Sequence, residues 1–263
     1  MDLQLTGRRA FVSGSTQGIG YAIARGLLHE GASVVINGRS AGRAQEAVQR
    51  LEADVPGAVV SALVADFADP SQVSRLLDDL GEVDVLVNNV GVFGLSAFGA
   101  ITDEEWQHYV DVNLMSGVRL SRQLLPGMLT RGWGRILFVS SESGVNVPAD
   151  MVHYGVTKAG MIALANGLAK LTRGTEVTVN TILGGPTFSD GVAATVTRFA
   201  DAQDMEPADL KAAIAAGNPT SLLQRFIEPR EIANLAVYLA SPLSSATNGA
   251  ALRADGGVLT TLT

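Results

Sequence analysis

The sequence predicts an α/β protein built on one doubly wound, mostly parallel sheet of about seven strands with helices on both faces. Short apolar runs alternate with helical patterns along the whole 263-residue chain. The runs are continuously apolar, as expected for parallel strands that are buried on both faces. A glycine-rich turn joins the first run to the first helical pattern. Helices between successive strands require right-handed crossovers, which produce a doubly wound sheet.

The predicted strands are short and rich in aliphatic and β-branched residues, which pack well on a pleated surface. They cover residues 9–12, 33–37, 59–65, 83–87, 135–139, 177–183 and 250–253.

The predicted helices carry apolar residues at the spacing of one helix face. Gly31 stands where a helix C-cap is expected, and Pro229 fits the first turn of the last helix. The helices cover residues 21–30, 43–51, 71–80, 103–129, 151–173 and 228–239, whereas residues 187–225 are less regular. Because no linker, low-complexity tract or internal repeat interrupts the pattern, we expect residues 1–263 to form one Rossmann-type domain.

Composition limits the classes of function. The net charge of −7 argues against nucleic acid or an anionic membrane as the main partner. The absence of cysteine excludes disulfides and thiolate chemistry, and the three histidines are too scattered for a metal site. The start lacks a secretory pattern and no apolar run reaches about 18 residues. We therefore expect a cytoplasmic protein without a membrane span or a metal.

The glycine turn predicts a nucleotide site. Gly14, Gly18 and Gly20 lie between the first strand and the first helix. Glycines allow a backbone to approach a pyrophosphate, and a helix N-terminus supplies free N–H groups. The spacing differs from the common Gly-x-Gly-x-x-Gly fingerprint. A tight turn alone is the alternative interpretation.

The end of the second strand bears on the choice of cofactor. An acidic residue there would bind the ribose 2′-hydroxyl of NAD. This chain has Asn37-Gly38-Arg39-Ser40 instead, and Arg39 could pair with a 2′-phosphate. A surface arginine at a helix start is the alternative. We favour NADP(H) over NAD(H).

Tyr154 and Lys158 share one face of a predicted helix, four residues apart. A phenol with a pKa near 10 is a poor base at neutral pH, and a fixed cation beside it favours the phenolate. The pair is therefore suited to interconverting an alcohol and a carbonyl. Many helices carry such a pair as a solvated face, so the spacing alone is weak evidence.

Nearly the whole chain resembles the classical short-chain dehydrogenase/reductase family, in particular its 3-oxoacyl-ACP-reductase-like members. The motifs occur in the order and at the spacing that this family has. The matching residues are Gly14, Gly18, Gly20, Asp66, Asn88-Asn89-Val90-Gly91, Asn113, Ser141, Tyr154, Lys158 and Asp255-Gly256-Gly257. The resemblance implies an NAD(P)-dependent oxidoreductase acting on a small carbonyl or alcohol.

The resemblance also implies a catalytic tetrad of Asn113, Ser141, Tyr154 and Lys158. Tyr154 would be the general acid or base, and Ser141 would bind the substrate oxygen. Lys158 would lower the pKa of Tyr154 and bind the nicotinamide ribose, while Asn113 would hold a water that links Lys158 to a proton relay.

Further residues are expected at the cofactor by the same resemblance. Asp66 and Phe67 would flank the adenine, and Asn89 would contact the ribose or support the sheet edge. The complete expected set is Gly14, Ser15, Thr16, Gln17, Gly18, Ile19, Gly20, Arg39, Asp66, Phe67, Asn89, Gly91, Tyr154, Lys158 and Thr187.

The chain departs from the family pattern at two places. Val90 replaces the usual alanine, which makes the cofactor site tight. Gly184 stands where the family usually has proline, which loosens that turn.

The resemblance implies a substrate lid at about residues 187–223. It also implies a homo-oligomer, a tetramer or dimer, whose interface is formed by the helix that begins at Asp103 and the helix that carries Tyr154. Two other interpretations stay open. One is an NAD(H)-dependent dehydrogenase of the same fold, and the other is a nucleotide-binding regulatory protein without turnover.

Overall fold

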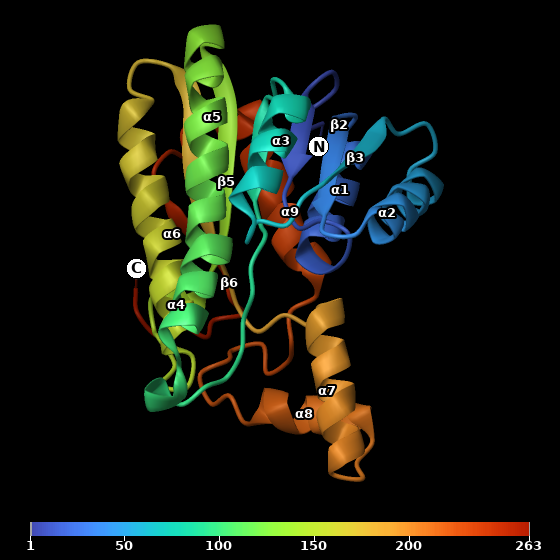
Figure 1. Cartoon of the computed structure of the whole chain (residues 1–263), viewed down its shortest axis with the longest axis vertical. Helices are drawn as coiled ribbons and strands as arrows, with labels where there is room; N and C mark the ends of the chain where they lie inside the picture. The colour runs from blue at the N-terminus through green and yellow to red at the C-terminus, as the bar shows by residue number, and fades with distance from the viewer. Residues whose placement is uncertain (1, 263) are drawn as a thin grey trace.

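The sheet of the computed structural model, which describes residues 2–262, is entirely parallel and has the strand order β3-β2-β1-β4-β5-β6-β7 (Figure 1). This arrangement confirms the predicted fold class. The strands are β1 Arg9–Val12, β2 Ser33–Gly38, β3 Val60–Val64, β4 Val85–Asn88, β5 Trp133–Ser141, β6 Glu176–Gly184 and β7 Ala251–Ala254.

Helices cover both faces of this sheet. They are α1 Gly18–His29, α2 Ala41–Asp54, α3 Pro70–Leu80, α4 Asp103–Tyr109, α5 Ser116–Arg131, α6 Val152–Leu171, α7 Asp190–Ala202, α8 Pro207–Ala216 and α9 Pro229–Ala240. Short 3-10 turns lie at Phe98–Ala100, Glu142–Gly144 and Pro242–Ser244. Among residues 2–262, no helix has the length and apolar character needed to cross a membrane.

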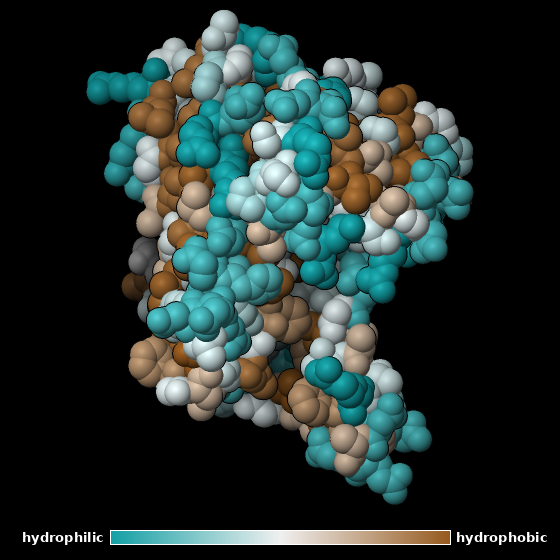
Figure 2. Space-filling model, in the orientation of Figure 1, coloured by the Kyte–Doolittle hydropathy of each residue, from teal (hydrophilic) through white to brown (hydrophobic). Residues whose placement is uncertain are grey.

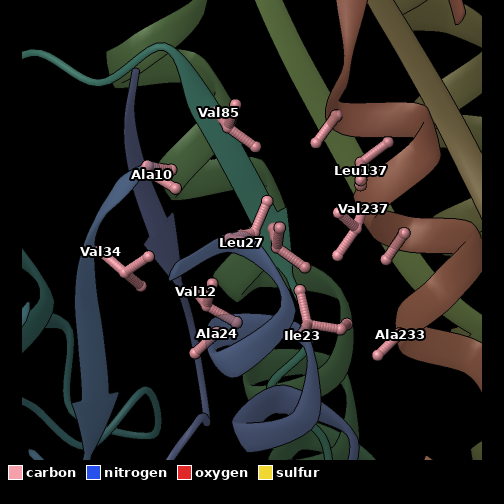
Figure 3. Close-up of a cluster of buried hydrophobic side chains, with 14 of the residues drawn as sticks. Ala10, Val12, Ile23, Ala24, Leu27, Val34, Val85, Leu137, Ala233 and Val237 are labelled. Atoms are coloured by element: carbon pink, nitrogen blue, oxygen red, sulfur yellow. The ribbon is translucent and has the colours of Figure 1, made fainter. Parts of the chain in front are cut away.

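Two hydrophobic cores follow from the alternation of side chains along the strands. Val85 and Val87 of β4 join the core under α1, α2 and α9, whereas Leu86 joins the core under α3, α5 and α6. Figure 3 shows side chains of α1 and α9 meeting the strands in the first core. A strand that is buried on both sides must be apolar at every position, which explains the continuous runs in the sequence.

The segment predicted as one helix over residues 103–129 is interrupted. A π-helical stretch, Val110–Met115, separates α4 from α5, and Asn113 lies within it. A π-bulge inserts an extra residue into the helical ladder and often occurs at functional sites. The apolar periodicity continues through the bulge, so the sequence pattern did not reveal it.

Residues 187–225 are more regular than expected, because they contain α7 and α8. The side chain of Ser189 caps α7 by accepting from Val192 N at 3.4 Å, and Pro207 begins α8. No residue of α8 is buried, so it lacks the apolar stripe by which helices are predicted. The two helices extend from the body as an arm (Figure 1). We refer to residues 187–223 as the lid.

The loops that follow β1 and β4 lie side by side at the carboxyl ends of these two central strands. These two strands are neighbours, yet their following connections lead to opposite sides of the sheet order. Ligands of open α/β sheets bind at such a switch point, beyond the carboxyl ends of the strands. The strand order therefore locates the candidate site.

Candidate active site

The glycine turn after β1 packs directly on the loop after β4. Gly14 has φ +61°, and a Cβ there would lie 2.9 Å from the Cα of Val90. A Cβ on Gly20 would lie 2.5 Å from Asn89 Nδ2. Asn89 Nδ2 donates to Ser13 O at 3.0 Å and to Gly14 O at 2.9 Å. Asn89 thus supports the turn, and Gly14 must lack a side chain because the Val90 backbone lies against it.

A cleft opens beside this turn and brings most of the expected cofactor residues together. It is lined by Gly14, Thr16, Gln17, Gly18, Ile19, Gly20, Arg39, Asp66, Phe67, Asn89, Gly91, Tyr154 and Lys158, and also by Ser40, Arg43, Ser189 and Gly191. Figure 2 shows hydrophobic side chains along the junction of the lid with the body.

Two expected residues lie outside the cleft lining. Ser15 is fully buried, and its Oγ donates to Val12 O at 2.6 Å and accepts from Asn37 N at 3.0 Å. Thr187 is also buried and donates to Gly185 O at 2.8 Å. Both side chains hold backbone in place.

The glycine turn contacts a carboxylate of the chain itself, the side chain of Asp190. Gly18 N donates to Asp190 Oδ2 at 2.6 Å, so a carboxylate of the lid takes the N–H group at the start of α1. Free N–H groups and the helix dipole favour negative charge at this point. The same geometry fits a pyrophosphate, which would have to displace Asp190.

Two arginines occupy the far end of the cleft. Arg39 and Arg43 are exposed, and within residues 2–262 neither makes an ion pair. Arg43 is a candidate that sequence reasoning missed, although it follows Arg39 by one helical turn. The Oδ1 of Asp66 accepts from Ala68 N at 2.9 Å. Phe67 lines the cleft next to Asp66, and its side chain is buried in the core under α3, α5 and α6.

Tyr154 and Lys158 line the cleft, and Ser141 is hydrogen-bonded to Tyr154 just outside its lining. Ser141 ends β5, whereas Tyr154 and Lys158 lie in the first two turns of α6. Lys158 Nζ lies 5.5 Å from the centroid of the Tyr154 ring and donates to Val139 O at 2.9 Å. The edge of the Phe93 ring contacts Tyr154, with centroids 6.5 Å apart.

The side chain of Asn113 joins the loop after β4 to α6. Its Oδ1 accepts from Val92 N at 2.7 Å, and its Nδ2 donates to Val92 O at 3.0 Å and to Thr157 Oγ1 at 3.0 Å. Both Asn113 and Lys158 lie against Gly91. Asn113 therefore fixes the wall of the cleft next to Lys158.

The electrostatics of the pair differ from the sequence expectation. Loss of water around the phenol raises the pKa of Tyr154, a hydrogen bond between Tyr154 and Ser141 opposes the rise, and the charge of Glu142 adds to it. Burial lowers the pKa of Lys158 to about 8, although Glu142 opposes this. At neutral pH Tyr154 is thus a protonated phenol, which suits a proton donor, beside a charged lysine.

Two glycines that sequence reasoning missed hold Ser141 against α6. A Cβ on Gly144 would lie 2.8 Å from the carbonyl carbon of Lys158. A Cβ on Gly155 would lie 2.5 Å from Val147 Cγ1 and 2.8 Å from Ser143 O. The 3-10 turn after β5 can pack on α6 only because both positions lack a side chain. This contact sets the distance from Ser141 to Tyr154.

Gly155→Ala should therefore destabilise the protein by about 1–3 kcal/mol through overpacking and also lower kcat. Gly167→Ala on the same helix is the matched control, because a Cβ there would meet no atom of a neighbouring element within 4 Å. That control should gain up to about 1 kcal/mol from helix propensity and keep its activity. Denaturant unfolding and turnover measure both effects. Equal stability of the two variants would contradict the packing argument.

The chain matches the family model described as short chain dehydrogenase over residues 8–198. It belongs to the short-chain dehydrogenase family. The expectation drawn from the ordered motifs is thereby confirmed, and so is the enzyme class of an oxidoreductase.

Relatives of this short-chain dehydrogenase cover its full length. It is 42% identical to the uncharacterized oxidoreductase YvrD of Bacillus subtilis, with 100% of both chains covered. It is 30% identical to the 3-oxoacyl-[acyl-carrier-protein] reductase FabG of Vibrio harveyi, covering 97% of this chain and 99% of the relative. Its structure resembles that of L-sorbose reductase from Gluconobacter frateurii complexed with NADPH and L-sorbose, with a TM-score of 0.94, 32% identity and full coverage of both chains.

Family and fold together establish the general reaction. This short-chain dehydrogenase is an NAD(P)-dependent oxidoreductase that interconverts a carbonyl and an alcohol. The cleft beside the glycine turn holds residues that suit the phosphates of such a cofactor, namely the Gly18 N–H group and the side chains of Arg39 and Arg43.

Proposed function

We propose that the chain is a cytoplasmic, NADP(H)-dependent reductase of a small carbonyl compound, with Tyr154 as the general acid. The observation that carries the proposal is that Tyr154 and Lys158 lie together in the lining of the cleft, with Ser141 hydrogen-bonded to Tyr154. A protonated phenol with a hydroxyl beside it is suited to receive a carbonyl oxygen.

The preference for NADP(H) is supported by charge. The end of β2 carries no carboxylate, and Arg39 and Arg43 line the cleft without an ion-pair partner in the described part of the chain. An arginine binds a 2′-phosphate through its planar fork. The structural relative L-sorbose reductase was solved with NADPH.

In the proposed reaction the cofactor, when bound, supplies the hydride. Tyr154 donates its phenolic proton to the carbonyl oxygen, and Ser141 donates a hydrogen bond to the same oxygen as negative charge develops there. Lys158 stays cationic beside Tyr154 and so stabilises the phenolate that remains after proton transfer. Oxidation of the alcohol reverses these proton transfers.

This role of Lys158 predicts a pH dependence. Its pKa is lowered to about 8 by burial, so the cation is present below that pH and is lost above it. We expect kcat/KM for reduction to fall as the pH rises through about 8, measured from pH 6 to 10. Residual activity of Lys158→Arg should lack this limb, because a guanidinium stays charged throughout. The same limb in that variant would contradict the assignment.

Turnover across a panel of ketones with NADPH and NADH tests the proposal. Reduction with NADPH at clearly higher kcat/KM supports it. A preference for NADH would favour the NAD(H)-dependent alternative, and tight cofactor binding without any turnover would favour a regulatory protein. We also propose a homo-oligomer, a tetramer or dimer, formed through α4, α5 and α6, which light scattering can measure.

A further inference from the structure

A carboxylate stands directly against the proposed substrate-binding serine. The Oε2 of Glu142 accepts a hydrogen bond from Ser141 Oγ, and its Oε1 accepts from Ser143 Oγ at 3.1 Å. Glu142 is half-buried, and within residues 2–262 it makes no ion pair. Its charge also acts on both Tyr154 and Lys158.

This arrangement conflicts with reduction of a plain ketone. Ser141 has one hydroxyl proton, which it donates to Glu142, while its oxygen accepts from Ser143 N at 3.1 Å. To bind a substrate oxygen, Ser141 must withdraw that proton from Glu142. A half-buried carboxylate then loses a hydrogen bond, next to an oxygen where negative charge develops. Losing a bond to a charged group is unfavourable.

A substrate that carries its own hydrogen-bond donor can remove this conflict, because it can replace the bond that Glu142 loses. When a carbonyl oxygen binds Ser141 Oγ, a hydroxyl on the carbon next to the carbonyl is separated from that oxygen by only three covalent bonds. A hydroxyl on that carbon would reach the carboxylate that touches the same Oγ. The apolar residues Val145 and Val147, which follow in the same loop and are 46% and 39% exposed, offer such a hydroxyl no acceptor in their side chains.

We propose that Glu142 is a specificity-determining residue that accepts a hydrogen bond from a hydroxyl adjacent to the substrate carbonyl. The substrate class is therefore α-hydroxy ketones and, in the reverse direction, vicinal diols. This inference rests on the proposed function, because it places the substrate oxygen between Ser141 and Tyr154. It adds the substrate group that the site recognises beyond the reacting carbon.

The test compares an α-hydroxy ketone with its O-methyl ether, in which one methyl group replaces the donated proton. 1-Hydroxyhexan-2-one can donate to Glu142, whereas 1-methoxyhexan-2-one cannot. The variants are Glu142→Leu, which removes the acceptor, and Glu142→Gln, which keeps an acceptor oxygen without the charge. Glu52→Gln, an exposed carboxylate on α2, is the matched control.

We expect the native enzyme to favour the hydroxy ketone by about 10- to 100-fold in kcat/KM, as a hydrogen bond to a charged group allows. Glu142→Leu should bring this ratio close to one; any change in absolute rate that comes from the lost charge beside Tyr154 and Lys158 affects both ketones equally and leaves the ratio untouched. Glu142→Gln should fall between, and Glu52→Gln should match the native enzyme. A ratio that persists in Glu142→Leu, or an equal loss for both ketones, would overturn the inference.

A binding measurement separates this inference from the proposed function. The affinities of both ketones for the enzyme–NADP⁺ complex can be determined by ligand-detected NMR without turnover. Failure of the native enzyme to reduce any ketone would contradict the proposed function. A binding preference for the hydroxy ketone that Glu142→Leu abolishes would still support the role of Glu142, and equal binding of the two ketones to the native complex would refute it.

Discussion

Tyr154→Phe should lower kcat for ketone reduction by about 10²- to 10⁴-fold, the usual contribution of a positioned general acid. The raised pKa keeps the phenol protonated at neutral pH, so its proton is available to the carbonyl oxygen. Phenylalanine retains the ring that packs on Phe93 but has no proton to donate. Stopped-flow or steady-state oxidation of NADPH, followed at saturating ketone, measures the loss.

Cofactor affinity and a second tyrosine provide the controls. NADPH should bind Tyr154→Phe within about twofold of the native affinity, because the glycine turn and the arginines are unchanged. Tyr238→Phe alters a 39% exposed phenol on α9 and should keep full activity. Retained activity in Tyr154→Phe would remove Tyr154 from the mechanism. Lost cofactor binding would mean that the variant acts through the cleft instead.

Arg39→Asp should weaken NADPH binding by about 10- to 100-fold and reverse the cofactor preference. The change removes a charge-assisted hydrogen bond to the 2′-phosphate and places a carboxylate where NAD enzymes bind the ribose 2′-hydroxyl. NADH binding should therefore stay the same or become tighter. Fluorescence titration with the two cofactors gives the ratio of dissociation constants.

Matched arginines show whether the effect is local. Arg75→Asp makes the same charge change on the exposed face of α3, outside the cleft, and should leave both affinities unchanged. An unchanged cofactor ranking in Arg39→Asp would contradict the role of Arg39. If Arg43→Asp alone shifted the preference between NADPH and NADH, Arg43 would be the residue that binds the 2′-phosphate.

The architecture could be predicted from the sequence because its signals are local. Continuous apolar runs mark strands that are buried on both faces, and the 3.6-residue period marks the helices that cover them. The Tyr154 and Lys158 pair is also a local feature, since four residues span about one helical turn. The glycine turn was placed correctly because a strand and a helix flank it directly.

Other features depended on which distant segments pack together. Gly18 and Asp190 are 172 positions apart, yet a hydrogen bond joins them. The π segment around Asn113 and the close approach of Gly155 to Val147 are likewise invisible in the periodicity.

The sequence by itself determined the fold class and the residue types of the site, including the serine, tyrosine and lysine of the proposed mechanism. Only the tertiary structure decided how each of them is used. It turned Ser15 inward, engaged Asn113 with Val92, raised the pKa of Tyr154 and placed Glu142 on Ser141. Burial and hydrogen-bond partners decide these roles, and both depend on long-range packing that no local pattern encodes.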